Sequence, residues 1–135
     1  MAANVTFQIA LYSPDLQTDI LDLSVTNTLI NATQGGMLRE DIVPTSSTGV
    51  VIADKDAYAD TSKLYVYNAS TTTDAGSRIF ISFDAGATAH LSIKGGEWAL
   101  IPWTALGCPV VGDRLDIHAW SATADNTLEY GVFDV

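Results

Sequence analysis

The chain has 135 residues, of which 16 are acidic and 6 are basic, giving a net charge of −10 at pH 7. Hydrophobic residues make up 47% of the chain and charged residues only 16%, a composition that excludes a disordered chain and suits a single domain over residues 1–135. The few Lys and Arg residues do not cluster, so the sequence argues against nucleic-acid binding and against binding to anionic membranes.

The first two strands are predicted from alternating apolar residues. Residues 5–11 alternate with period two, and so do residues 21–25, whose pattern can extend to Ile30. Residues 37–44 (MLREDIVP) show no clear period and could form one helical turn or an irregular arm that ends at Pro44. A short β run follows over residues 49–53.

The second half of the chain carries most of the β pattern. Six further strands are predicted, over residues 63–68, 78–83, 89–93, 98–103, 114–120 and 127–135. About nine strands with turn signals between them are typical of an antiparallel sandwich or barrel. We therefore predict an all-β fold, a single antiparallel β-sandwich or a jelly-roll-like barrel.

The sequence offers little support for catalysis. His90 and His118 are the only two histidines, each lies on an alternating strand, and no G-x-S-x-G nucleophile motif is present. Glu97 could serve as the acid of a glycosidase, but no partner carboxylate can be nominated, and a Glu after two glycines fits an exposed turn equally well. We predict that the protein is not an enzyme and has no catalytic residues.

An acidic loop over residues 54–60 is the one segment that suggests a metal. The calcium loop of an EF-hand would need an oxygen ligand, Gly and Glu where this chain has Tyr58, Ala59 and Tyr65. An irregular calcium site on Asp54, Asp56 and Asp60 stays open beside the simpler interpretation of a solvated loop. We expect no metal and no cofactor.

Aromatic residues in the second half allow two interpretations. They could form a platform that stacks on sugars, or they could fill the core or a subunit interface. The residues concerned are Tyr65, Tyr67, Trp98, Trp103 and Trp120. The aliphatic neighbours of the tryptophans in the segment ALIP favour the core or an interface.

Four segments resemble the small all-β virion proteins of tailed bacteriophages. They are residues 79–83, the turn and strand GGEWALIPW at 95–103, the alternating strand at 113–119, and the closing LEYGVF at 128–133. The resemblance covers roughly residues 63–135 and is a pattern of strands and turns. No resemblance is found for residues 1–62.

The resemblance implies a structural protein of the virion, most plausibly a capsid decoration or cement protein that stabilises the head at capsomer junctions. It implies the major capsid protein or other virion proteins as partners, a homo-oligomer, with a trimer favoured, and assembly in the host cytoplasm. The absence of a secretion signal at MAANVTFQ agrees with this expectation, and it leaves the sequons at Asn4, Asn31 and Asn68 without a role.

Two other functions remain open, and one set of residues is nominated for contacts. The first is a tail- or fibre-associated binding module, which could be a carbohydrate-binding one, and the second is a small hydrolase. The apolar residues of the segment at 37–44 lack a core period, and the tryptophans of the GGEWALIPW segment suit an interface. The predicted interface residues are Met37, Leu38, Ile42, Val43, Trp98 and Trp103.

Overall fold

The computed structural model describes residues 3–13, 21–32, 35–44, 49–58, 61–86, 88–104 and 115–133. We predicted a single domain, and the contacts within the chain fall into two compact units, one of residues 1–33 with residue 135 and one of residues 34–134. The two units are described one at a time.

The first unit is an antiparallel hairpin of β1 (Ala3–Ser13) and β2 (Leu21–Ala32). Ile9 lies opposite Val25 and Gln8 lies opposite Thr26, so apolar pairs alternate with polar pairs along the ladder. The two strands predicted from period-two alternation are therefore confirmed. The pairing continues to Ala3, with a register shift between Ala3 and Val5.

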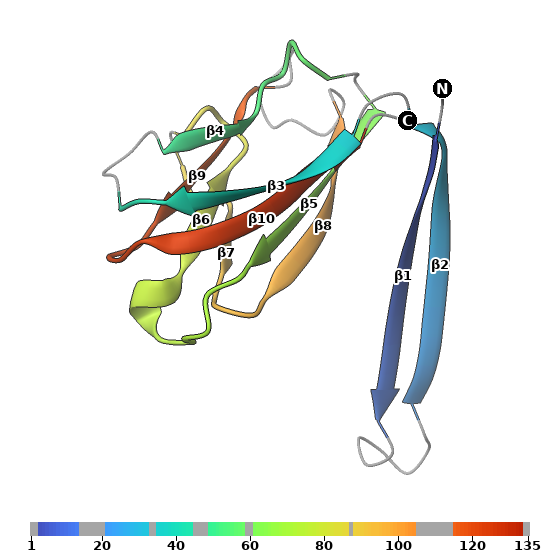
Figure 1. Ribbon diagram of the computed structural model, residues 1–135, viewed down its shortest axis with the longest axis horizontal. Helices are drawn as coiled ribbons and strands as arrows, with labels where there is room; N and C mark the ends of the chain where they lie inside the picture. The colour runs from blue at the N-terminus through green and yellow to red at the C-terminus, as the bar shows by residue number, and fades with distance from the viewer. Residues whose placement is uncertain are drawn as a thin grey trace. The chain divides into compact units, whose positions relative to one another are not determined.

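The second unit is a sandwich of two four-stranded antiparallel sheets (Figure 1). One sheet has the order β3-β10-β5-β8 and the other has the order β4-β9-β6-β7. The strands are β3 (Gly35–Ile42), β4 (Val50–Ala53), β5 (Thr61–Asn68), β6 (Ile79–Ser82), β7 (Leu91–Ile93), β8 (Trp98–Thr104), β9 (Ile117–Ser121) and β10 (Asn126–Phe133). A short 3₁₀ turn, η1 (Ala75–Ser77), is the one helical element in the described residues.

The strand order is that of a jelly roll. Counting β3 as strand 1 and β10 as strand 8, the two sheets read 1-8-3-6 and 2-7-4-5. The first and last strands thus lie side by side, and successive strands pass from one sheet to the other except for β6 and β7, which are neighbours in one sheet. The predicted all-β class, with an antiparallel sandwich of jelly-roll type, is confirmed.

Residues 37–42 form a strand rather than a helical turn or an irregular arm. They belong to β3, whose whole length pairs with β10. The apolar residues Met37, Leu38 and Ile42 are not spaced with period two, so the sequence alone does not predict a strand here. The segment is a strand because it pairs with the distant strand β10. Beyond Ile42, the Val43 carbonyl accepts from the Ser121 N–H and carries the chain to the second sheet.

The core lies between the two sheets and follows directly from strand alternation. Residues of β9 and of the first half of β10 are buried at every second position, since period two sends alternate side chains inward, and the last four residues of β10 are all buried. The fully buried apolar side chains come from both sheets. They are Ile42, Leu64, Val66, Ile79, Ile81, Ile117 and Leu128.

Asn68 is a polar anchor inside this apolar core. Its side-chain amide is fully buried and donates to the carbonyls of Ser77 at 2.6 Å and Ile93 at 3.1 Å. Its backbone N–H donates to the Glu97 carbonyl at 3.0 Å, which ties the end of β5 to the start of β8. The amide nitrogen that a sequon would offer for glycosylation is therefore engaged inside the fold.

Gly95 packs against the same region. A Cβ built at Gly95 would lie 1.9 Å from the Thr72 carbonyl oxygen, so no side chain fits there. Gly96, the next residue, has a φ of 81°, which glycine adopts without strain. The Gly95-Gly96 pair therefore lets the β7–β8 turn approach the backbone that follows β5.

We predict that Asn68→Ala lowers the free energy of unfolding by about 3 kcal/mol, because two buried carbonyls lose their donor. Urea denaturation measures this change. The exposed Thr71→Ala serves as the control and should stay within about 0.5 kcal/mol of the unchanged protein. An equal effect of the two substitutions would contradict the anchoring role of Asn68.

Candidate functional site

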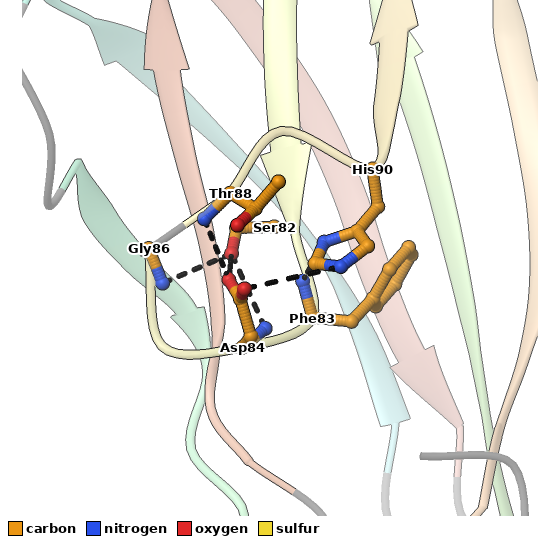
Figure 2. Close-up of polar contacts among 6 residues, drawn as sticks. All are labelled: Ser82, Phe83, Asp84, Gly86, Thr88 and His90. Carbon is orange, nitrogen blue, oxygen red and sulfur yellow. Dashed lines mark hydrogen bonds and ion pairs between the residues drawn. The ribbon is translucent and has the colours of Figure 1, made fainter. Parts of the chain in front are cut away.

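The polar side chains with reactive chemistry meet in the segment that follows β6 (Figure 2). The hydroxyl of Ser82 donates to Asp84 Oδ1 at 2.5 Å, and Asp84 Oδ2 lies 3.9 Å from His90 Nε2. A serine, an aspartate and a histidine are thus gathered within nine residues of one loop. The chemistry they can perform depends on which atom faces which.

Backbone groups fix the carboxylate and the hydroxyl of this loop. The N–H groups of Asp84 and Gly86 donate to Ser82 Oγ at 3.2 and 2.9 Å, and the Thr88 N–H donates to Asp84 Oδ1 at 2.9 Å. Ala85 takes a φ of 58°, an uncommon value for a residue with a Cβ. The side chains of Ser82 and Asp84 therefore replace the backbone pairing that the tight loop lacks.

The ionisation of Asp84 follows from these contacts. Partial burial by itself would raise the pKa of Asp84, but the hydrogen bonds from Ser82 and from the backbone and side chain of Thr88, with the nearby His90, outweigh it. The net result lowers the pKa of Asp84 from 3.8 to about 2. Asp84 is a carboxylate whose oxygens are occupied by the loop itself.

His90 is held in an orientation that a catalytic triad does not use. Its Nδ1 accepts from the Phe83 N–H at 3.2 Å, so the proton of the neutral ring lies on Nε2, which faces Asp84. In a triad the imidazole accepts from the serine hydroxyl and donates to the carboxylate through its other nitrogen. Here Ser82 is fully buried and donates to Asp84 directly, so the arrangement closes a loop and presents no nucleophile.

The two histidines were candidates from the sequence, whereas Ser82 and Asp84 were not predicted to belong to a site. The signal was present as Ser-x-Asp-x-Gly directly after a strand, a spacing that lets a hydroxyl and a carboxylate hydrogen-bond to nearby backbone N–H groups. His118, the second histidine, lies on β9 opposite Ser82 in the ladder.

The other candidates for polar chemistry also act within turns. The Glu97 carboxylate accepts from the Lys94 N–H at 2.8 Å and so closes the β7–β8 turn. Asp54 accepts from the Asp56 N–H at 2.8 Å, and Lys55 Nζ lies 2.7 Å from Asp56 Oδ1. Asp60 lies outside the described residues.

No metal cluster is found within the described ranges, where three or more His, Cys, Asp or Glu side chains are nowhere grouped to hold an ion. The single cysteine, Cys108, lies outside the residues that the structure describes. In that same described part of the chain, no helix has the length and apolar character needed to cross a membrane.

The outer face of the sheet β3-β10-β5-β8 carries a row of aromatic and charged side chains. Direct pairing across the four strands aligns Arg39, Glu129, Tyr67 and Trp98 in that order. Arg39 Nη1 lies 3.3 Å from Glu129 Oε1, so the charges at one end of the row compensate each other. Neighbouring strands place these residues on one face, since directly paired residues point the same way.

A second row runs beside the first on the same face. It aligns Met37, Gly131, Tyr65 and Leu100 across the same strands. Burial, the Glu129 carboxylate and the Tyr67 phenol raise the pKa of Tyr65, which places these groups close together. We call Tyr65, Tyr67, Trp98 and Leu100 the aromatic face.

The predicted interface residues divide into two groups. Met37, Leu38, Val43 and Trp98 are exposed, and Met37 and Leu38 line an open depression of about 340 Å³ with Arg39 and Glu129. This first group is available for contacts with a partner.

The second group consists of Ile42 and Trp103, which lie in the core. Trp103 packs edge-on against Tyr58, with ring centroids 6.1 Å apart. Both residues belong to alternating strands at inward positions, so they stabilise the sandwich and are not part of an interface.

Comparison with known proteins gave no match to any family model, curated protein or solved structure. The resemblance to virion proteins of tailed bacteriophages therefore stays a prediction.

We predict that Asp84→Asn removes part of the acid sensitivity of the fold. A carboxyl whose pKa is about 2 when folded and 3.8 when unfolded stabilises the fold fully above pH 3.8, and the contribution is lost as the pH falls towards 2. The free energy of unfolding should thus drop less between pH 7 and pH 2.5 in the variant, as measured by urea denaturation. Between pH 7 and pH 5 the two proteins should change alike, and an equal drop at pH 2.5 would contradict the role of Asp84.

Proposed function

We propose that this protein is a structural component of a tailed-phage virion, a decoration protein that binds the major capsid protein at capsomer junctions. The protein acts as a rigid jelly-roll body that presents one sheet to its partner. Repetition over a capsid lattice then converts weak individual contacts into stable attachment.

One observation carries this proposal: most of the exposed apolar side chains belong to the two edge strands of one sheet, β3 and β8, or directly follow β3. Of the five large apolar residues exposed in the described part of the chain, four lie on or next to the sheet β3-β10-β5-β8. They are Met37, Leu38, Val43 and Trp98. Apolar residues gathered in this way support an interaction surface, whereas singly scattered ones would need no explanation.

Two further features agree with a role in binding. The Ser82–Asp84–His90 loop uses its polar atoms internally, so the best-formed polar cluster of the described residues supports the fold. Jelly rolls include both viral capsid domains and lectin domains, so the topology by itself fits the proposal without deciding it.

The test is the location of the protein in a particle. Purified virions of the phage that encodes this chain should contain it in many copies by mass spectrometry, and cryo-electron microscopy should place it on the outer capsid surface. Its absence from purified virions would refute the proposal. Density on the tail would favour the tail- or fibre-associated module.

We predict that Trp98→Ala weakens attachment to capsids that lack the protein by about tenfold or more, because exposed Trp residues at such surfaces are frequent hot spots. Binding is measured by co-sedimentation with the capsids. Val51→Ala is the matched control, since Val51 is 47% exposed and Trp98 49%, and Val51 lies on the other sheet. Equal loss in both variants would argue against the aromatic face.

A carbohydrate is the second candidate ligand, and the composition of the aromatic face favours it. Tyr67 and Trp98 are paired directly across two strands, and Glu129 continues the same row on β10. Exposed rings can stack on the apolar face of a sugar, while phenol and carboxylate groups hydrogen-bond its hydroxyls. Compensation of Glu129 by Arg39 favours a neutral sugar.

Affinity electrophoresis in gels that contain soluble xylan, mannan or mixed-linkage β-glucan tests this second candidate. A sugar-binding face should retard the unchanged protein and Val51→Ala, and Trp98→Ala should migrate as it does without polysaccharide. No retardation by any of the three polysaccharides would exclude this function and leave the virion proposal standing.

A further inference from the structure

We propose that two copies of this protein pair through the free edges of their β3 strands, antiparallel, about a two-fold axis at Glu40. The sheet β3-β10-β5-β8 of each copy then continues into that of the other as one eight-stranded sheet. This inference concerns self-association and does not depend on the virion proposal.

The first observation is that β3 is a free edge of its sheet within the described ranges. It pairs with β10 along its full eight residues, and no strand in the described ranges pairs with its other side. Gly35–Ile42 contains no proline and no lysine, and its charged residues, Arg39, Glu40 and Asp41, block edge-to-edge pairing unless the partner strand compensates them. An edge of this length offers a continuous row of backbone donors and acceptors to a second strand.

The second observation is that exposed apolar side chains concentrate on this edge. Met37 is 54% exposed, Leu38 56% and Val43 43%, and these are three of the five large apolar residues that are exposed among the described residues. Two of the three lie within the edge strand and the third follows it directly. A partner strand would cover them, which a single copy does not do.

Charge identifies a second copy as the occupant. Each copy carries a net charge of −10, so two copies repel except where their charges compensate. The outer face of β3 carries Arg39 and Asp41, two residues apart on the same strand. When a second copy of β3 lies antiparallel to the first, Arg39 of each copy can lie opposite Asp41 of the other, so the charges of this edge are complementary to those of an identical edge.

The same argument fixes the register. In an antiparallel pair, directly opposed residues lie on the same face of the sheet. A two-fold axis between the strands must therefore lie midway between the two copies of one residue, which are opposed to each other. An axis at Arg39 would oppose the two Arg39 side chains, and an axis at Leu38 would leave Arg39 opposite Met37. An axis at Glu40 opposes Arg39 and Asp41 twice.

The register centred on Glu40 also matches the apolar residues. It opposes Leu38 to Ile42 of the second copy and brings Met37 level with Val43 of the second copy. Met37 and Val43, both exposed, therefore face each other, and the match occurs twice because of the symmetry; Leu38 lies beside Ile42, whose own side chain stays buried in its sandwich.

The two Glu40 residues are opposed at the axis, and each is drawn back towards its own chain. The Tyr130 hydroxyl donates to Glu40 Oε2 at 3.3 Å, which holds the carboxylate over β10 rather than over the free edge. Burial, followed by the Glu40 charge and hydrogen bond and by Tyr58, raises the pKa of Tyr130 to about 12, so the phenol remains a donor at neutral pH. Arg39 and Asp41 keep their own contacts with β10 and remain accessible, since the Arg39 side chain is 67% exposed.

A charge exchange tests the pairing and its register together. Light scattering on a sizing column should give the mass of two chains for the full-length protein. Arg39→Asp and Asp41→Arg should each raise the dimer dissociation constant at least tenfold, and the double variant should restore the dimer, because the charges then face each other in reverse. Lys63→Asp, on β5, changes the net charge as Arg39→Asp does and should remain dimeric.

Several outcomes would overturn the proposal. A single-chain mass at high protein concentration excludes self-association, and a three-chain mass favours the trimer implied by the phage resemblance. A dimer unaffected by both single substitutions excludes β3, and failure of the double variant to recover excludes the register. Circular dichroism checks that each variant is folded.

A cross-linking experiment keeps the proposal testable if the charge variants do not fold. With Cys108 replaced by Ala, Glu40→Cys should form a disulfide between two copies under mild oxidation, since opposed residues at the axis bring their Cβ atoms close. Lys63→Cys in the same background is the control and should stay unlinked. Equal cross-linking of both variants would contradict the proposed axis.

Discussion

The central position of β10 is the constraint on which the rest of the sandwich depends. This last strand lies between β3 and β5, so it joins the beginning of the sandwich unit to its middle. The contact between Tyr130 and Glu40 spans 90 positions of the chain. Pairing between segments so far apart in the chain lowers the conformational entropy of the long loop that it closes. Burial of the apolar side chains Leu128, Tyr130 and Val132 offsets this unfavourable contribution to the free energy of folding.

Strand alternation then determines both surfaces of that sheet. Because Leu128 and Val66 point into the core, Glu129 and Tyr67 must point outward, and direct pairing aligns them with Arg39 and Trp98. The aromatic face is therefore a consequence of packing the core in one register. A slip of one residue would bury the charges and expose the core, so the same alternation specifies the fold and the binding surface.

The sequence predicted the elements with strict period two and missed the element without it. The strands around Val66, Ile79 and Ile117 have apolar residues at every second position, and the prediction for them was correct. The strand β3 carries exposed Leu38 beside buried Ile42 because it lies at an edge, so only its distant partner β10 makes it a strand. The Ser82–Asp84 contact was not predicted for a related reason. The hydrogen-bond partners of a hydroxyl and a carboxylate in a loop depend on the backbone conformation of the loop, which the residue types alone do not determine.

The polar and apolar groups of the described residues are used in opposite ways. Ser82, Asp84 and Asn68 form hydrogen bonds inside the described fold. Trp98 and Leu38 remain about half exposed, and contact between their apolar surface and water is unfavourable in free energy. Covering exposed apolar area lowers the free energy of a protein, so both proposed associations, one at the aromatic face and the other at the β3 edge, predict a gain in stability.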